Sequence, residues 1–313
     1  MRIRPRTAVC WVLWTVISCL LLSAQSVMAQ SRTETVTGPD GWPIRFSYYP
    51  APEKNGATPI DLSKAPVVIL LHGEDGDRSF WDKRSAPPGA AGKPFSEVLQ
   101  SQGYAVISVD LRKHGQSTQE GNSKVNSNDY ELMVGDLLAV KGFILEQHQA
   151  KKLNMRKMGI IALDDSVPVA ATFAERDWMM PPYDDHPIPS EKTPRGQDVR
   201  ALVLLSPTLN AGRVQATNSM RYLGNPTLGV AVFIGVGKKD TAGDRNARKL
   251  YQIVTAKGED ERFKLEQFET AEKSEHLFGS ARVRAEIPIL TFLKKYVQDP
   301  DMAWQDRRSR TDR

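Results

Sequence analysis

The stretch from Lys157 to Arg176 reads KMGIIALDDSVPVAATFAER and joins a strand to a helix. Met158 to Leu163 form an apolar run without alternation, which is typical of a strand covered on both faces. After Ser166, apolar residues recur at helical spacing at Val169, Ala170, Phe173 and Ala174. Ser166 is therefore predicted at the junction between strand and helix, where a catalytic side chain is well placed.

Other segments repeat this alternation of strand and helix. Apolar runs predict strands at 65–71, 104–109, 199–205 and 230–236, and the segment 263–268 reads as the last strand. Helices are predicted at 95–102, 130–149, 246–256 and 281–297. Two more strands, at 33–37 and 43–49, flank a Gly-Pro-Asp-Gly turn and read as a hairpin. We expect an α/β fold with a mostly parallel central sheet, helices on both faces and an antiparallel N-terminal hairpin. Only about twenty residues separate the strands at 199–205 and 230–236, so a large cap domain is not expected there.

The composition fits a single domain. The chain has 313 residues, of which 40% are hydrophobic and 25% are charged, enough to build a substantial core. We expect a signal peptide at 1–29, a folded domain at 30–298 and a charged, disordered tail at 299–313.

The N-terminus carries the features of an export signal. Arg2, Arg4 and Arg6 precede an apolar run at 7–22, and Val-Met-Ala at 27–29 offers a cleavage site before Gln30. This predicts an exported protein, periplasmic or secreted. An uncleaved membrane anchor is the alternative, although the run is shorter than the ~20 apolar residues of a membrane span.

Cysteine usage bears on the same segment. The run Val-Ile-Ser-Cys at 16–19 resembles a lipoprotein box, so lipidation of Cys19 is a second route to membrane contact. The only other cysteine is Cys10, so a cleaved chain would have no disulfide and no thiol nucleophile.

Cleavage would also remove three arginines and no acid, which reduces the net charge from +5 to +2. A nearly neutral chain does not predict nucleic-acid binding.

Several of these residues resemble the motifs of the α/β-hydrolases. That family carries its nucleophile in a G-x-S-x-G elbow between strand and helix, as Ser166 is placed here. His72-Gly73 ends a strand as in the family, and the segment 110–117, DLRKHGQS, is similar to its D-x-R-x-H-G-x-S stretch, in which His114 would be structural. Asp240 and His276 follow the predicted strands at 230–236 and 263–268, in the family's order of nucleophile, acid and base.

The resemblance implies a serine hydrolase. Ser166 would attack a small-molecule ester, or less readily an amide, with His276 as base and Asp240 orienting it, and water would release the acyl-enzyme. Backbone N–H groups of Val167 and of Gly73 or Glu74 would form the oxyanion hole. No metal or other cofactor is implied.

Two residues depart from the family pattern. Asp164 and Pro168 stand where the elbow has glycines. Pro168 biases Val167 away from the helical region, and an unpaired Asp164 would oppose a developing oxyanion. A catalytically inactive homologue that binds a ligand or partner is therefore the alternative function.

Other roles stay open at this point. Asp165 could be an aspartate nucleophile that forms an alkyl ester, and Asp244 or Glu275 could replace Asp240 as the acid. The proline-rich segment 178–198 reads as a lid or a surface insertion, and its Asp184-Asp185-His186 is a weak candidate metal cluster.

Overall fold

The computed structural model describes residues 30–55, 58–84, 93–119, 124–280 and 282–313. The predicted signal peptide, including Cys19, lies outside these residues. No helix in the described ranges is long and apolar enough to span a bilayer.

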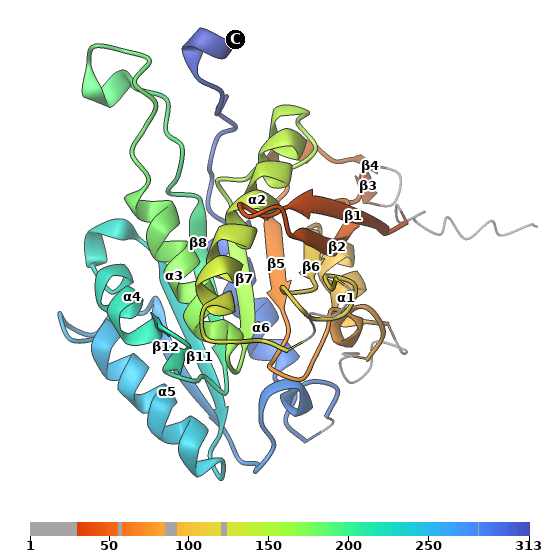
Figure 1. Cartoon of the computed structure of the whole chain (residues 1–313), viewed down its shortest axis with the longest axis vertical. Helices are drawn as coiled ribbons and strands as arrows, with labels where there is room; N and C mark the ends of the chain where they lie inside the picture. Colours follow the sequence, from red (N-terminus) through yellow and green to blue (C-terminus); the bar gives the residue numbers. More distant parts are fainter. Residues whose placement is uncertain (1–29, 56–57, 85–92, 120–123, 281) are drawn as a thin grey trace, which may run out of the picture.

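The centre of the molecule is an eight-stranded sheet in the order β1-β2-β6-β5-β7-β8-β11-β12 (Figure 1). β1 pairs antiparallel with β2 and β2 with β6, whereas the six strands from β6 to β12 run parallel. The expected hairpin and mostly parallel sheet are confirmed. The strand bounds are β1 Arg32–Thr37, β2 Pro43–Tyr49, β5 Val67–Leu71, β6 Ala105–Val109, β7 Met158–Leu163, β8 Val199–Leu205, β11 Ala231–Gly237 and β12 Phe263–Phe268.

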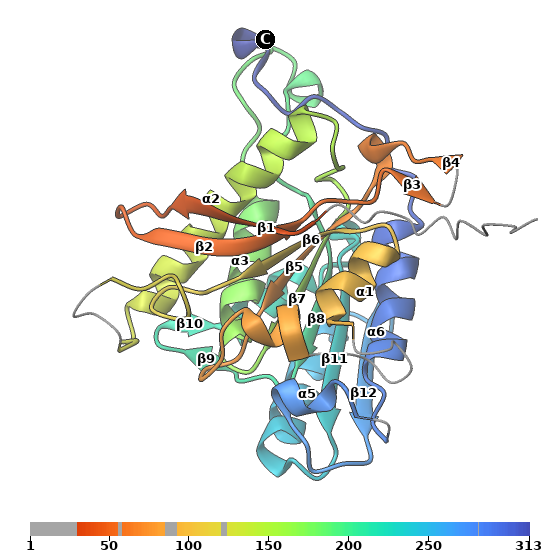
Figure 2. The same cartoon turned by 90° about the vertical axis from the view of Figure 1, so that its right-hand side faces the viewer.

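Helices cover both faces of this sheet (Figure 2). One core cluster joins one face to α2, α3, α4 and α5, and a second joins the other face to α1 and α6. Their bounds are α1 Phe95–Ser101, α2 Asp129–Gln149, α3 Ser166–Met179, α4 Ala216–Leu223, α5 Thr241–Val254 and α6 Glu286–Leu293. Short elements complete the chain: β3 Lys54–Asn55, β4 Thr58–Pro59, β9 Asn210–Ala211, β10 Val214–Gln215, η1 Leu62–Lys64, η2 Phe80–Arg84, η3 Pro189–Glu191, η4 Pro226–Leu228, η5 Ser274–Leu277, η6 Lys294–Gln298 and η7 Arg310–Asp312.

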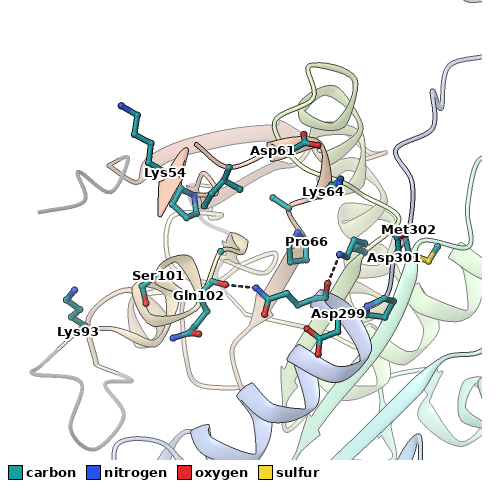
Figure 3. Close-up of a pocket in the computed structure, with 17 residues that line it drawn as sticks. Lys54, Asp61, Lys64, Pro66, Lys93, Ser101, Gln102, Asp299, Asp301 and Met302 are labelled. Carbon is teal, nitrogen blue, oxygen red and sulfur yellow. Dashed lines mark hydrogen bonds between the residues drawn. The ribbon is translucent and has the colours of Figure 1, made fainter. Parts of the chain in front are cut away.

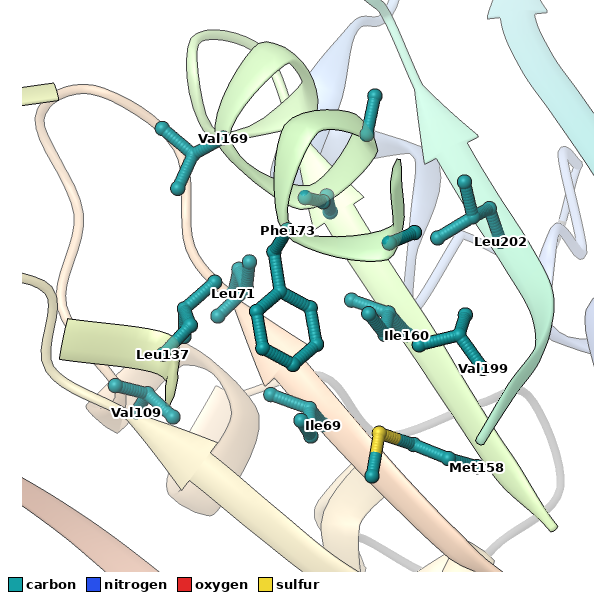
Figure 4. Packing of buried hydrophobic residues seen from close by; sticks show 14 of the residues in the cluster. Ile69, Leu71, Val109, Leu137, Met158, Ile160, Val169, Phe173, Val199 and Leu202 are labelled. Atoms are coloured by element: carbon teal, nitrogen blue, oxygen red, sulfur yellow. The ribbon is translucent and has the colours of Figure 1, made fainter. Parts of the chain in front are cut away.

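Successive residues of the central strands point alternately into the two hydrophobic cores. Ile69 and Ile160 belong to the cluster under α3, whereas Val68 and Ile161 belong to the opposite one. Figure 4 shows the ring of Phe173, on α3, beside Ile69 and Ile160. Because both faces are covered, these strands need continuous apolar sequence, and the runs identified in the sequence have this pattern.

The connection between β8 and β11 is short. Among the described residues it holds only β9, β10, α4 and η4, so no large cap domain covers the carboxyl ends of the strands. The fold therefore leaves that edge of the sheet open to a site.

The predicted disordered tail is instead packed against the domain, so that prediction is wrong. The ring of Trp304 stacks on His148 with centroids 5.1 Å apart, and the buried Arg307 pairs with Asp198. The backbone N–H of Arg310 donates to Asp185 over 2.9 Å. Stacking and buried ion pairing hold a tail whose charged composition alone predicts disorder.

These contacts also place the proline-rich segment 178–198. It leads directly into the amino end of β8 and lies beside the C-terminal tail (Figures 1 and 2). Asp164 follows the carboxyl end of the parallel neighbour β7, at the opposite edge. The segment is therefore a surface insertion, and the lid interpretation is wrong.

Candidate functional site at the carboxyl edge of the sheet

The turn after β7 centres on Asp164, which has a left-handed backbone with φ of 48°. Its N–H donates to the carbonyl of Leu205 over 3.1 Å, and its carbonyl accepts from the N–H of Thr208 over 3.3 Å. Bonds to the chain after β8 thus hold a conformation that costs a non-glycine residue energy. The strained position of the elbow is occupied by an aspartate.

Ser166 lies two residues further on, as the first residue of α3, and is fully buried. Its Oγ donates to the carbonyl of Leu163 over 2.7 Å and accepts from the N–H of the same residue over 2.9 Å. The hydroxyl therefore closes the turn. Asp164 thus takes the central, strained position of the G-x-S-x-G pattern. The two glycine positions of that pattern then correspond to Ala162 and Ser166.

The structure does not connect the three residues of the predicted triad. Asp240 is half-buried and caps α5, accepting from the N–H of Gly243 over 3.2 Å. His276 is exposed on η5, and within the described part of the chain its ring makes no hydrogen bond. No hydrogen bond between described residues joins Ser166, Asp240 and His276. The serine hydroxyl thus has no imidazole in position to take its proton.

Two serines missed in the sequence lie beside the turn instead. Ser206 (φ 46°) and Ser274 (φ 52°) are also left-handed and buried, and the N–H of Ser274 donates to the Oγ of Ser206 over 2.7 Å. Gly73 lies against both Ser274 and Asp164: a Cβ there would come within 2.9 Å of Asp164 Oδ2 and 3.1 Å of Ser274 Oγ. Their positions in the sequence could have indicated them, because Ser206 directly follows β8 and Ser274 follows β12.

The surroundings of the Asp164 carboxyl group raise its pKa. Burial raises the pKa of Asp164, and the charges of Asp240 and Glu74 raise it further, against the opposing effects of Ser274 and Lys273. These effects place Asp240 and Glu74 near the Asp164 carboxylate. The half-buried surroundings of Asp164 therefore disfavour its ionised form.

Asp165, the alternative aspartate nucleophile, is buried behind the turn. Burial raises its pKa to about 6, although a hydrogen bond from the Tyr130 hydroxyl over 2.7 Å lowers it. Among the described residues its other oxygen, Oδ1, has no hydrogen-bond partner. Asp165 has φ of −75°, in the right-handed region, so it does not occupy the strained position.

The predicted oxyanion-hole residues are only partly available. Val167 is buried, and its N–H donates to the carbonyl of Asp164 over 3.2 Å. Gly73 faces the Asp164 carboxylate, and exposed Glu74 accepts at its carbonyl from the ring of His114 over 2.8 Å. A carboxylate, rather than an electropositive hole, occupies this corner.

The other histidines near the edge hold loops together. Burial and the charge of His114 lower the pKa of His72 to about 3; its Nδ1 lies 2.7 Å from the Gly73 carbonyl, and its Nε2 accepts from the N–H of Leu111 over 3.1 Å. The second ring nitrogen of His114 lies 2.9 Å from the Arg112 carbonyl. Each ring nitrogen of the two histidines thus lies within hydrogen-bonding distance of a backbone atom, which agrees with the predicted structural role of His114.

The structure shows no metal cluster at the acidic segments. No group of three or more potential ligands is found in the described ranges. In the candidate cluster, Asp184 pairs with Lys192 over 2.5 Å, and Asp185 accepts from the N–H groups of Thr193 and Arg310. These carboxylates fix the insertion to itself and to the tail.

Comparison with solved structures identifies the class of fold. An esterase of Pyrococcus furiosus superposes with a TM-score of 0.58 at 15% identity, covering 93% of this chain and 96% of its own. A puromycin-hydrolysing peptidase of Mycobacterium tuberculosis gives 0.60 at 12%, covering 87% of this chain and 40% of its own. The esterase domain of a Rhodothermus marinus protein gives 0.51 at 13%, covering 86% of this chain and all of its own.

The sequence comparisons add no closer relation. No protein-family model matches the chain, and no curated protein matches it. An alpha/beta hydrolase of Penicillium is also among the similar structures, with a TM-score of 0.53 at 10% identity, covering 86% of this chain and 99% of its own. The chain has the α/β-hydrolase fold, which it shares with these esterases and peptidases.

Proposed function

We propose that this protein uses the α/β-hydrolase fold to bind a ligand at the carboxyl edge of the sheet without serine-dependent acyl transfer. The observation that carries the proposal is that Asp164, and not Ser166, is the left-handed residue of the elbow. The hydroxyl of Ser166 is instead hydrogen-bonded to the backbone of Leu163. A serine nucleophile needs an adjacent base and an accessible hydroxyl. The burial of Ser166 and the bonds of its Oγ to Leu163 support the proposal.

The residues at the edge support a ligand that donates hydrogen bonds. A carboxylate such as Asp164 accepts hydrogen bonds and attracts cations. Two acids, Asp240 and Glu74, and one base, Lys273, act on the Asp164 pKa, so the formal charge around this carboxylate is negative. Three left-handed non-glycine residues meet here, and such strain accumulates at binding and catalytic sites. The favoured ligand therefore carries an ammonium group.

Hydrolysis of short-chain p-nitrophenyl esters tests the catalytic half of the proposal. We expect the wild type and S166A to show the same background rate across chain lengths. Turnover that S166A abolishes would overturn the proposal and restore the acyl-enzyme mechanism.

Thermal unfolding tests the binding half. Butylammonium chloride should raise the Tm of the wild type, because a ligand that binds only the folded state stabilises it. Sodium butyrate at equal ionic strength should not, and D164N should lose the butylammonium effect. An equal shift in D164N would show that Asp164 does not bind the cation.

A second candidate follows from the elbow itself. An aspartate in this strained position could attack an alkyl carbon and form an alkyl ester, as the aspartate-nucleophile hydrolases do. Incubation with a reactive alkyl halide would then add an alkyl mass to the peptide holding Asp164, and D164N would not be modified. An unmodified wild-type peptide would exclude this candidate.

Export is part of the proposal. The run of arginines and apolar residues before Gln30 supports cleavage by a signal peptidase. N-terminal sequencing of the protein from its native compartment should begin at Gln30. A chain that retains Met1 would contradict cleavage, and one that begins with a lipidated Cys19 would place the protein at a membrane.

A further inference from the structure

A second candidate site lies at the opposite edge of the sheet. A cavity of about 900 Å³ is lined by Pro66 and Lys157, at the amino ends of β5 and β7, and by the chain from Gln298 to Met302 (Figure 3). Its volume lies within the range of small-molecule sites. Because β5 and β7 are parallel, this cavity and Asp164 lie at opposite ends of the strands.

The feature that points to a ligand is the ammonium group of Lys157. The residue is only 7% exposed, and its Nζ donates to the Gln298 carbonyl over 2.6 Å. An ammonium group has three donors, and burying a charge without a counter-ion is costly. In the described part of the chain, no carboxylate forms an ion pair with Lys157. A buried cation with unused donors therefore lines the cavity.

The remaining charges make the cavity wall basic. Lys54, Lys64 and Lys93 also line it, and none of them forms an ion pair with a described residue. In Figure 3, Lys54 and Lys93 point away from Pro66, so they belong to the rim. Burial is the main cause that lowers the pKa of Lys157; the charges of Asp301 and Asp299 oppose it, and that of Lys64 adds to it to a smaller extent. Lys64 and Lys157 are thus the lining lysines that lie next to the amino ends of β5 and β7.

Three aspartates on the same wall oppose an anion to different degrees. Asp61 accepts from the N–H and Oγ of Ser63, and Asp299 pairs with Lys294 over 2.6 Å. Asp301, like Asp299, raises the pKa of Lys157 from a distance. Four lysines thus face three aspartates on the lining, which leaves a formal excess of one positive charge.

We propose that this cavity binds the anionic group of a small organic phosphate or carboxylate. Lys157 and Lys64 would hold the oxyanion, and the apolar side chains of Ile60, Pro66 and Met302 would contact the organic part. The proposal is independent of the site at Asp164.

Isothermal titration with hexyl phosphate, hexanoate, inorganic phosphate and hexylamine tests the proposal. We expect binding of hexyl phosphate and hexanoate, weaker binding of inorganic phosphate and none of hexylamine. The K157M variant should lose at least about tenfold in affinity for hexyl phosphate, the effect of one charge-assisted hydrogen bond. Failure of both hexyl phosphate and hexanoate to bind, or equally tight binding of hexylamine, would overturn the proposal.

Matched variants assign the site. K64M alters an exposed residue and should weaken hexyl phosphate several-fold, so it gives an answer even if K157M fails to fold. K257M, an exposed lysine outside the cavity lining, should bind as the wild type does. D164N should also leave this affinity unchanged, which separates the outcome from the proposed function. Wild-type affinity in K64M and in a folded K157M would overturn the assignment.

Discussion

At the scale of single residues, the protonation of the buried Asp165, next to Asp164 in the elbow, makes the stability of the protein depend on pH. The Asp165 carboxyl has a pKa of about 6 because it is buried, well above its ordinary 3.8. The folded state therefore favours the neutral form. This contribution to stability is fully present below pH 4 and is lost as the pH rises through 6.

Substitution D165N should consequently stabilise the protein at pH 7. Asparagine keeps an acceptor for Tyr130 but carries no charge to bury. At about 1.4 kcal/mol per pKa unit, the free energy of unfolding should rise by roughly 2 to 3 kcal/mol at pH 7, with little change at pH 4. Urea unfolding at both pH values measures this, with E259Q, an exposed acid, as the control. Equal effects of D165N at both pH values would contradict a raised pKa.

Ser166 illustrates how a catalytic residue type can have a structural role. Its hydroxyl makes two buried bonds to Leu163. S166A should lower the free energy of unfolding by about 1 to 2 kcal/mol, because the Leu163 groups lose their partner in the core. Chemical denaturation beside S190A, an exposed serine, measures the difference. An S166A variant as stable as the wild type would show that these bonds do not hold the turn.

At the scale of elements, the tail and the proline-rich insertion share a buried ion-pair network. Lys141 contacts Asp177 and lies 2.8 Å from Asp198, which in turn pairs with Arg307. All four side chains are buried. Removing one partner leaves an uncompensated charge in the interior.

R307M should therefore destabilise the protein by about 3 to 5 kcal/mol. R308M, next to it in the tail, breaks only an exposed pair with Asp306 and should leave the stability nearly unchanged. Thermal unfolding of the two variants separates the effects. Similar Tm values for R307M and R308M would mean that the tail does not pack as described.

The elements also show what sequence patterns can predict. β7 and β8 have the predicted bounds, because continuous apolar runs are required of covered strands. The elbow could not be placed to the residue, since Asp164, Asp165 and Ser166 all fit a strand-to-helix turn. Which of them takes φ of 48° depends on bonds to Leu205 and Thr208, which are far away in the sequence. The tail was missed because its order depends on tertiary partners such as His148 and Asp198.

At the scale of the whole molecule, the parallel strands separate the turn at Asp164 from the cavity at the amino edge. The carboxyl edge gathers Asp164, Asp240 and Glu74, whereas the amino edge carries the lysine-lined cavity. The α/β-hydrolase fold is clear in the sheet order and in the similar solved structures. Function must be argued from the sites, because one fold serves many activities.

The most direct test of this account compares the accessibility of positions 164 and 166. In a background where Cys10 and Cys19 are replaced by serine, D164C and S166C each carry one thiol, whose reaction with Ellman's reagent reports its exposure. Because Asp164 is half-buried and Ser166 is fully buried, D164C should react at least about tenfold faster, and S166C should react fully only after unfolding. If the native S166C variant reacted as fast as D164C, position 166 would be open to substrates, and the assignment of Asp164 to the elbow would be wrong.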